Sequence, residues 1–391
     1  MLHLPRVSVI LGLAIAAGCA GVSPRPEAAT AATLPQVELS AAQSKRLSEL
    51  VDTCVQTVVM RRYDDAERAA HSAIAIEPRC ARARAVLGMV MLQRARLQDP
   101  ADLMLANGGE AETRLAEQLA PEDPFVGWMR AVFLAESGHI SAAAAAADEA
   151  LARTTKATPE ARAALLGVAG TYRYELGEER AARPLLQEYL SIRPEDAAAN
   201  FRLGSCLLRI AAVPMGPKEK ADLIAQNSAD DAARAFARSF ELAPGDEDAA
   251  LAVGTAWLRA AELAEARRDT ATRDQRLEAA NKQFEQVATL FPNSAEAMFR
   301  LGLTAERRGD RAAAEAAYGK ALEREAQHLG ALLNFAALLE DGKGQEGAPV
   351  EDPRTPQRVR ELLQRALEAD ARRPGLTDSE RTRIVKRLKG A

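Results

Sequence analysis

The sequence predicts an all-α fold of about eight stacked helix pairs, and a recurring proline–glycine spacing is the main observation that predicts it. Four times, a proline is followed ten residues later by a glycine that has Leu or Val directly before it. The pairs are Pro78 with Gly88, Pro194 with Gly204, Pro244 with Gly254 and Pro292 with Gly302. Gly170 and Gly204 lie 34 residues apart, which gives the length of one unit. Composition agrees, because 48% hydrophobic but only 4% aromatic residues suit thin helix–helix contacts.

Each recurring residue has a physical reason. A glycine in the middle of a first helix lets a second helix approach closely. Gly138, Gly177 and Gly309 are expected to end first helices, since glycine readily adopts the left-handed conformation at a helix stop. Small residues should open the second helices on the side that faces the first, namely Ala66, Ala143, Ala182, Ala232, Ala280 and Ala314. Bulkier residues follow four and seven positions later, which is the spacing of one buried stripe.

These markers divide the chain into eight units and a cap. The units are expected at roughly 47–80, 81–123, 124–158, 163–196, 197–246, 247–294, 295–328 and 329–373, within a repeat domain over 41–376. Thr377 and Glu380 form a capping-box pattern, which predicts a final helix over 377–389 in a terminal segment 377–391. Four stretches are expected to be insertions or lengthened helices, and such places often bind partners: Ala95–Asn107, Ala211–Ser228, Glu262–Leu277 and Gly342–Pro353.

The order Gly170, Gly177, Ala182, Leu186, Tyr189-Leu190 and Pro194 resembles the tetratricopeptide repeat, a helix–turn–helix unit. The resemblance covers about six-sevenths of the chain. It departs most in the terminal units, where Cys54 and Ala336 stand in place of glycine, as expected for repeats with one unpartnered face. The resemblance implies a right-handed superhelical solenoid whose first helices line a concave groove for a protein partner.

The N-terminus predicts export and lipidation. Arg6 precedes an apolar run from Val7 to Ala17, which is too short to span a bilayer and suits a signal peptide over 1–18. Small residues directly before Cys19 resemble the lipobox of bacterial lipoproteins, in which the cysteine is lipidated. The alternative is an ordinary cleaved signal with a chance cysteine. Because an acidic residue after the cysteine retains such lipoproteins at the inner membrane, Ala20 favours the outer membrane.

Residues 19–40 are expected to form a flexible tether behind the lipidated cysteine. Prolines stand among Ala, Ser and Thr in this stretch, with almost no apolar periodicity. No other stretch of the sequence approaches eighteen consecutive apolar residues, so we expect membrane contact through the lipid anchor only.

Charge and motif content argue against several function classes. The net charge is −4, with acidic and basic residues mixed, so no basic block predicts nucleic-acid binding. No His-x-x-x-His, Cys-x-x-Cys, phosphate-loop or nucleophile-elbow motif occurs. The glycine clusters Gly108-Gly109 and Gly342–Gly347 are expected to lie in loops between helices. We therefore expect no metal site, no cofactor and no enzymatic activity.

Three cysteines remain besides Cys19. Cys54 and Cys80 could pair in an oxidising compartment, but Cys54 falls mid-helix and Cys80 in the following turn, which is a poor geometry for a bridge. Small buried hydrophobes are the favoured role for these residues and for Cys206, and the disulfide stays open.

A stripe on the first helices supplies the candidate binding residues. Positions three before and one, four and five after each Leu-Gly glycine share one helical face, away from the packing glycine. The resemblance implies that this face lines the concave groove. The candidates are Trp128, Tyr174, Phe201, Leu208, Arg209, Leu258, Arg259, Phe299, Leu303 and Arg307.

The three arginines of this stripe predict the chemistry of the partner. Arg209, Arg259 and Arg307 recur one per unit, and guanidinium groups in register suit the carboxylates of a peptide. We expect an acidic or amphipathic protein segment in the C-terminal half of the groove. Two alternatives stay open: the apolar members pack between helices, and the arginines form salt bridges to acids on neighbouring helices.

Two function classes follow from these observations. The first is a periplasm-facing scaffold on the outer membrane of a Gram-negative bacterium, which helps to assemble an envelope complex. The resemblance supplies secretin or pilus assembly, outer-membrane assembly and motility machinery as candidate processes. The alternative is binding of peptidoglycan or another glycan, or a role as adaptor for cell-wall hydrolases. Trp128, Tyr172 and Tyr174 are the only aromatic cluster that would suit a glycan.

Overall fold

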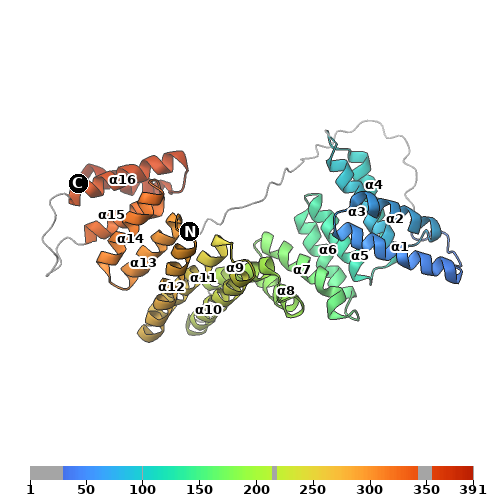
Figure 1. The fold of residues 1–391 in the computed structure, drawn as a ribbon, viewed down its shortest axis with the longest axis horizontal. Coiled ribbons are helices and arrows are strands. Elements are labelled where there is room, and N and C mark those ends of the chain that lie inside the picture. Colours follow the sequence, from blue (N-terminus) through green and yellow to red (C-terminus); the bar gives the residue numbers. More distant parts are fainter. Residues whose placement is uncertain (1–29, 99, 214–217, 342–354, 391) are drawn as a thin grey trace. The chain divides into compact units, whose positions relative to one another are not determined.

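The described part of the chain is a succession of helices, most of which are joined by short turns. The computed structural model describes residues 30–98, 100–213, 218–341 and 355–390, and no strand occurs within these ranges (Figure 1). The helices belong to two compact units, Met1–Pro194 and Glu195–Ala391. The prediction of an all-α repeat fold is confirmed, whereas the right-handed twist of the array stays a prediction.

The first unit contains four helix pairs. α1, α3 and α5 each pack against the helix that follows and against the next odd-numbered helix, and α7 packs against α8. α1 begins at Ala41, before the predicted start at 47, because Ser40 and Gln43 form a capping box. The helices are α1 (Ala41–Val59), α2 (Tyr63–Ile76), α3 (Ala81–Arg96), α4 (Leu103–Leu119), α5 (Pro124–Glu136), α6 (Ile140–Arg153), α7 (Pro159–Glu175) and α8 (Glu179–Ile192).

The second unit contains four further pairs and the predicted final helix. Its helices are α9 (Ala197–Ala212), α10 (Lys218–Leu242), α11 (Glu247–Ala266), α12 (Thr270–Leu290), α13 (Ala295–Arg307), α14 (Arg311–Arg324), α15 (Leu329–Asp341), α16 (Thr355–Arg372) and α17 (Asp378–Gly390). α11 and α12 have 20 and 21 residues against 13 and 14 in the next pair, which confirms the lengthening over Glu262–Leu277. Most of the Ala211–Ser228 insertion is the first part of α10.

The helix pairs close on the predicted glycines. A Cβ atom placed on Gly254 would lie 2.5 Å from Phe284 Cε1, and one on Gly204 would lie 2.8 Å from Phe236 Cδ1. Gly302 faces Tyr318 in the same way. In each case the large residue stands four positions after the predicted small alanine of the second helix. The register predicted from the proline–glycine spacing is therefore confirmed.

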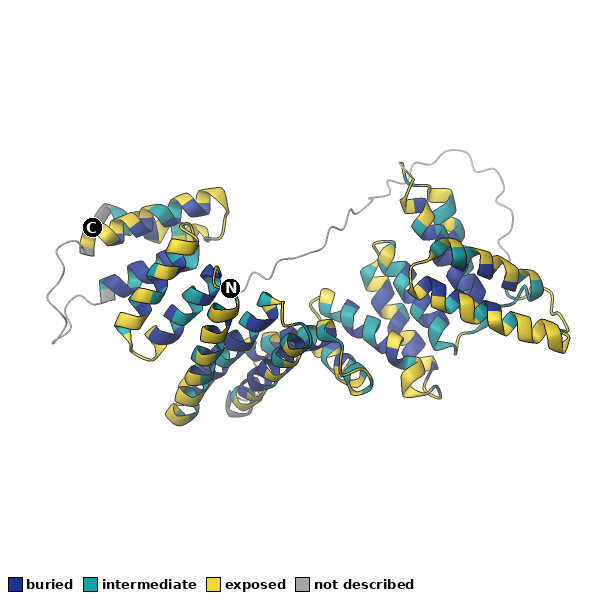
Figure 2. Ribbon diagram, in the orientation of Figure 1, coloured by how far each residue is buried: buried dark blue, intermediate teal, exposed yellow. Residues whose placement is uncertain are grey.

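Small residues on the second helices complete these contacts, although Ala232 and Ala280 lie in the middle of the lengthened α10 and α12 and not at their predicted starts. All six predicted alanines are fully buried, namely Ala66, Ala143, Ala182, Ala232, Ala280 and Ala314. Figure 2 shows buried positions on the inner faces of the pairs and exposed positions on the outer faces. The predicted helix stops are confirmed as well, because Gly138, Gly177 and Gly309 have φ values of 83°, 74° and 79°.

The prediction of a loop at Gly108-Gly109 is wrong. Both residues lie inside α4, and a Cβ on Gly109 would lie 2.5 Å from the carbonyl oxygen of Gly88 on α3. This pair of helices approaches backbone to backbone, so it needs a glycine on each side. The turn between α3 and α4 is consequently shorter than the predicted Ala95–Asn107 insertion. The Gly342–Gly347 cluster and most of the Gly342–Pro353 insertion lie outside the described residues.

Part of the predicted tether contacts the first unit. The Arg79 guanidinium donates a hydrogen bond to the carbonyl oxygen of Ala31 at 2.7 Å. Residues 1–29, with the signal peptide and Cys19, lie outside the described residues. Among the helices that the structure describes, none is both long and apolar enough to cross a bilayer.

Cys54 and Cys80 are free thiols in the structure. Cys54 and Cys206 are buried, which confirms their predicted role as small hydrophobes, whereas Cys80 is half-buried. Burial raises the pKa of the Cys54 thiol to about 12, with a smaller contribution from the nearby Cys80. A thiol with such a pKa is a poor nucleophile at neutral pH.

The final helix α17 is held by one buried carboxylate. Asp370 at the end of α16 accepts hydrogen bonds from the backbone N–H groups of Gly375 and Leu376, at 2.7 and 2.8 Å, and pairs with Arg381 of α17. The predicted capping box is confirmed, because Thr377 and Glu380 exchange hydrogen bonds. Together these bonds set the direction in which α17 crosses the last pair.

Gly254→Ala should destabilise the second unit, whereas Gly319→Ala, at another helix-interior glycine, should not. Overpacking against the buried Phe284 ring costs about 1–3 kcal/mol. A Cβ on Gly319 meets no atom within 4 Å, and replacing a helical glycine by alanine stabilises by about 0.5–1 kcal/mol. Urea unfolding followed by circular dichroism measures both. A Gly254→Ala midpoint at or above that of Gly319→Ala would contradict the register.

Asp370→Asn should lower the melting temperature at pH 7, and its deficit should shrink under acid conditions. Hydrogen bonds from Arg381, Gly375 and Leu376 lower the pKa of Asp370 to about 2. A lowered folded-state pKa gives stability that is present above the ordinary value of 3.8 and is lost as the pH falls through about 2.

Melting curves of wild type and variant at pH 7, 4, 3 and about 2 check this expectation. Asp378→Asn is the matched control, since Asp378 pairs with the same Arg381 but its side chain is fully exposed. A deficit for Asp370→Asn that stays constant down to the lowest pH would refute the assignment.

Candidate functional site

The apolar members of the predicted stripe contact neighbouring helices. The Phe201 ring packs edge-on against Phe236 with centroids 5.2 Å apart, and Leu208 packs against the same cluster. Leu258 is buried, and Leu303 contacts the core of the last pairs. These contacts favour the packing alternative, and a binding role for this set stays a prediction.

Phe299 of α13 contacts His328, a hydrogen-bonded residue directly before α15. Its ring lies 4.9 Å from that of His328, whose Nδ1 accepts a hydrogen bond from the N–H of Ala331. The other ring nitrogen, Nε2, must then carry the proton and donate to Glu296, at 2.9 Å. Burial by itself raises the pKa of Glu296, but the hydrogen bond from His328 and the charge of Arg300 outweigh it and leave the pKa lowered. Phe299 therefore helps to anchor a helix start.

The predicted arginine column is engaged within the chain. Arg259 donates to Glu262 at 3.0 Å and to the carbonyl oxygen of Ala211 at 3.1 Å. Arg307 donates to the other oxygen of Glu262 at 2.9 Å, and Arg209 also has an interaction within the chain. Glu262 lies in the lengthened part of α11. The predicted salt bridge to an acid on a neighbouring helix therefore describes Arg307, whereas Arg259 pairs with a glutamate of its own helix.

The aromatic cluster of the first unit is largely covered. Trp128 is half-buried, with its ring 5.6 Å from that of Phe125, and it contacts the cores of two successive pairs. Tyr172 is buried and Tyr174 is half-buried. This arrangement does not offer the flat exposed platform that a sugar ring would need.

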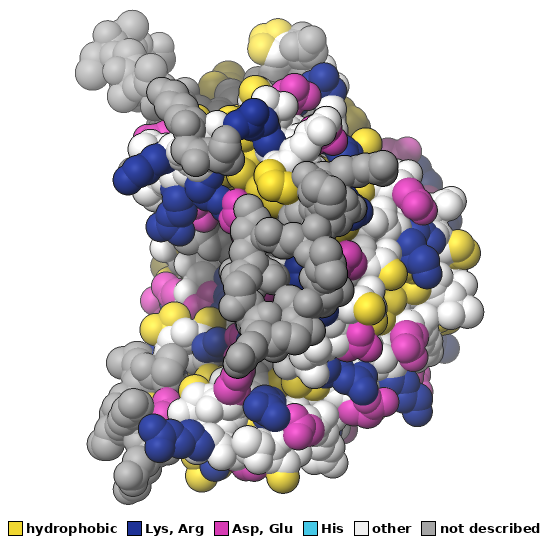
Figure 3. Space-filling view, turned by 90° about the vertical axis from the view of Figure 1, so that its left-hand side faces the viewer, with side chains coloured by type: hydrophobic (Ala, Val, Ile, Leu, Met, Phe, Trp, Pro, Cys, Tyr) yellow, Lys and Arg dark blue, Asp and Glu magenta, His cyan; other side chains and the backbone are white. Residues whose placement is uncertain are grey.

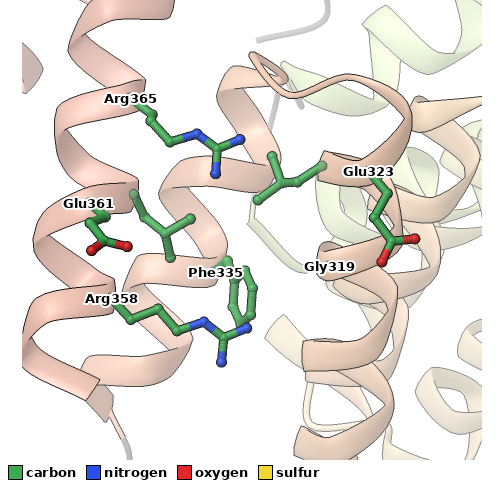
Figure 4. Close-up of a pocket in the computed structure, with 8 residues that line it drawn as sticks. Gly319, Glu323, Phe335, Arg358, Glu361 and Arg365 are labelled. Carbon is green, nitrogen blue, oxygen red and sulfur yellow. The ribbon is translucent and has the colours of Figure 1, made fainter. Parts of the chain in front are cut away.

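A hollow between α14, α15 and α16 is a candidate site that the sequence analysis missed. It has a volume of about 300 Å³ and is lined by Gly319, Leu322, Glu323, Phe335, Arg358, Glu361, Leu362 and Arg365 (Figure 4). Phe335, Leu322 and Leu362 give it an apolar floor. The hollow is open on its α14 side at Gly319, which has no side chain. A Cβ on that residue would meet nothing within 4 Å.

Two arginines of α16 face this hollow. The Arg358 guanidinium lies 4.5 Å from the centroid of the Phe335 ring, a cation–π contact. Arg365 donates one hydrogen bond at 2.6 Å to the carbonyl oxygen of Ala326. Within the described residues, neither arginine pairs with a carboxylate. They thus differ from Arg259 and Arg307, which share Glu262.

The carboxylates at the hollow lie at its edges. In Figure 4 the Glu361 carboxylate is on the outer side of α16, away from the two guanidinium groups, and Glu323 borders the hollow on α14. Glu361 accepts a hydrogen bond from Gln357 at 3.0 Å. The inner wall of the hollow is therefore basic and apolar, and its edges are acidic.

Sequence reasoning missed this hollow because its walls come from two different repeats. The seven-residue spacing of Arg358 and Arg365 was visible, and so was Gly319 in the interior of a second helix. Neither signal identifies a site until α14 and α16 are known to flank Phe335.

Within the described residues, no group of three or more His, Cys, Asp or Glu could hold a metal ion. On the visible face in Figure 3, acidic and basic side chains are interspersed.

Comparison with known proteins identifies the repeat. Residues 168–212 and 269–329 match the family model of the tetratricopeptide repeat, so these segments are tetratricopeptide repeats. No curated protein matches the sequence at a significant level.

Several solved structures are similar to this chain. PilF of Pseudomonas aeruginosa is 17% identical, covering 66% of this chain and 96% of that one, with a TM-score of 0.41. YrrB, a tetratricopeptide-repeat protein with an unusual peptide-binding site, is 21% identical, covering 57% and 96%, with a TM-score of 0.42. A tetratricopeptide-repeat protein of Thermus thermophilus is 19% identical, covering 57% and 97%, with a TM-score of 0.40. Scores this low support no inference about function.

Proposed function

We propose that this protein is a lipid-anchored scaffold of a Gram-negative envelope, which faces the periplasm and binds a segment of a partner protein. The tetratricopeptide repeats support the scaffold class, since repeats of this kind present extended surfaces for other proteins. The apolar run Val7–Ala17 followed by Cys19 supports export and lipidation, and Ala20 supports the outer membrane. Assembly of a secretin or pilus, of outer-membrane proteins or of motility machinery is the proposed range of processes.

The observation that carries partner binding is the hollow beside α16. Arg365 is half-buried, and the exposed Arg358 is held against an aromatic ring, yet neither has a carboxylate partner among the described residues. Charges that are partly removed from water are normally paired in proteins. An acidic partner segment would supply the missing charges. The partly covered Trp128 and buried Tyr172 lend the cell-wall alternative no comparable support.

Cys19→Ala should release the protein from the membrane fraction or block its maturation, because lipid attachment requires the cysteine sulfur. The helical content of the purified variant should equal that of wild type. Cys80→Ala, a half-buried cysteine within the repeats, is the matched control and should stay membrane-bound. Fractionation that finds Cys19→Ala in the outer membrane would reject the lipid anchor.

The tethered protein, purified from detergent-solubilised envelope, should co-purify with an envelope protein that mass spectrometry identifies. Added salt should weaken the complex, since screening reduces attraction between exposed charges. Purified sacculi should not retain the protein. Salt-resistant retention on sacculi without a protein partner would instead favour the cell-wall alternative.

A further inference from the structure

We infer that the hollow between α14 and α16 binds an amphipathic helical segment with carboxylates seven residues apart and a large apolar side chain midway between them. The inference rests on the proposed function and deepens it, because it names the chemistry of the scaffold's partner. The site lies between the second helices of two successive repeats, over Phe335 of the first helix α15, and it includes none of the predicted stripe residues.

The two arginines set the spacing of the carboxylates. Arg358 and Arg365 are seven residues apart on α16, which is about 10.5 Å along the helix axis at 1.5 Å per residue. Both side chains reach from α16 toward α14 in Figure 4. A helical ligand lying along α16 repeats with the same rise, so acids at i and i+7 meet both guanidinium groups. Seven residues make nearly two turns, which keeps both acids on one face of the ligand.

The floor of the hollow selects the residue between the acids. Positions i+3 and i+4 of such a ligand lie on the same face as the acids and point at Phe335, Leu322 and Leu362. A hollow of about 300 Å³ has room for one or two side chains such as Leu or Phe. Because Gly319 has no side chain, the ligand helix can approach α14 closely.

Charged groups around the hollow determine where the ligand can carry acidic residues. The Phe335 ring holds the Arg358 guanidinium in place, and the hydrogen bond to Ala326 does the same for Arg365. Carboxylates would bind these prepositioned groups through charge-assisted hydrogen bonds. Glu361 lies between the two arginines along α16 and Glu323 borders the hollow on α14, so both repel further acids, and the residues between i and i+7 should be neutral or basic.

The test measures binding of two fluorescein-labelled peptides of identical composition to the purified mature chain by anisotropy. Both have a neutral Ala/Gln helical host with two Leu, and the glutamates stand seven residues apart in one and five apart in the other. A shift from seven to five rotates the second acid about 140° off the binding face. We expect the seven-spaced peptide to bind at least about tenfold more tightly.

Variants of the protein locate the site. Arg358→Gln and Arg365→Gln should each weaken binding at least about tenfold. Gly319→Leu should abolish binding by filling the hollow, yet melt no lower than wild type, because it replaces a glycine inside a helix. Arg360→Gln is the matched control on the same helix, since Arg360 does not line the hollow, and it should bind as wild type does.

Three results would overturn the inference. The first is no binding of the seven-spaced peptide at protein concentrations up to about 1 mM, and the second is equal binding of both peptides. The third is unchanged affinity in Gly319→Leu. Displacement by inorganic phosphate together with equal binding of both peptides would identify a simple anion site. If Gly319→Leu still captures the envelope partner, the scaffold function stands and its site lies elsewhere.

Discussion

The close approach of two helices at a single glycine is the contact on which the rest of the structure depends. At Gly204, Gly254 and Gly302 the missing side chain admits one aromatic ring from the second helix, and no larger residue fits without moving a buried ring. The alanine four positions earlier on the second helix lets the two backbones stay close over a further turn. α3 and α4 use a stricter form of the contact, with a glycine on each side. Each repeat therefore has one fixed geometry, and within each compact unit successive repeats pack on the faces that this geometry leaves.

Because the core of each repeat is thin, a ligand site is expected on a surface between neighbouring repeats. Most apolar residues are used in holding a pair to its neighbours, so Phe201, Leu258 and Phe299 contact adjacent helices. A ligand site needs a local departure from that packing. The departure at α14–α16 is Gly319, a helical glycine with no neighbour against it, beside a Phe335 ring that supports an arginine.

Most of the charged residues discussed above are likewise used in contacts within the chain. Arg259 within α11 and Arg307 at the end of α13 both pair with Glu262 of the lengthened α11, and the Arg307 pair joins successive repeats. Exposed pairs of this kind contribute little to stability, about 0–1 kcal/mol each, but they neutralise the surface. Asp370 does more because it is buried and bonds both a turn and α17. Within the part of the chain that the structure describes, Arg358 and Arg365 take part in neither kind of network, which leaves their charges available to a ligand.

The sequence by itself determined the repeat, its register and its ends. Pro-to-Gly spacing, the six buried alanines, the three left-handed glycines and the Thr377 capping box are local signals, each tied to a neighbour in the same helix pair. Cys19 likewise depends on local sequence alone and stays a prediction. Only the tertiary structure decided which charges are paired and where a hollow opens. Glu262 meets Arg307 across 45 residues, and Gly319 faces Arg358 from another repeat, so no local pattern could predict either arrangement. Gly109 was missed for the same reason, since its requirement comes from the Gly88 backbone of the preceding helix.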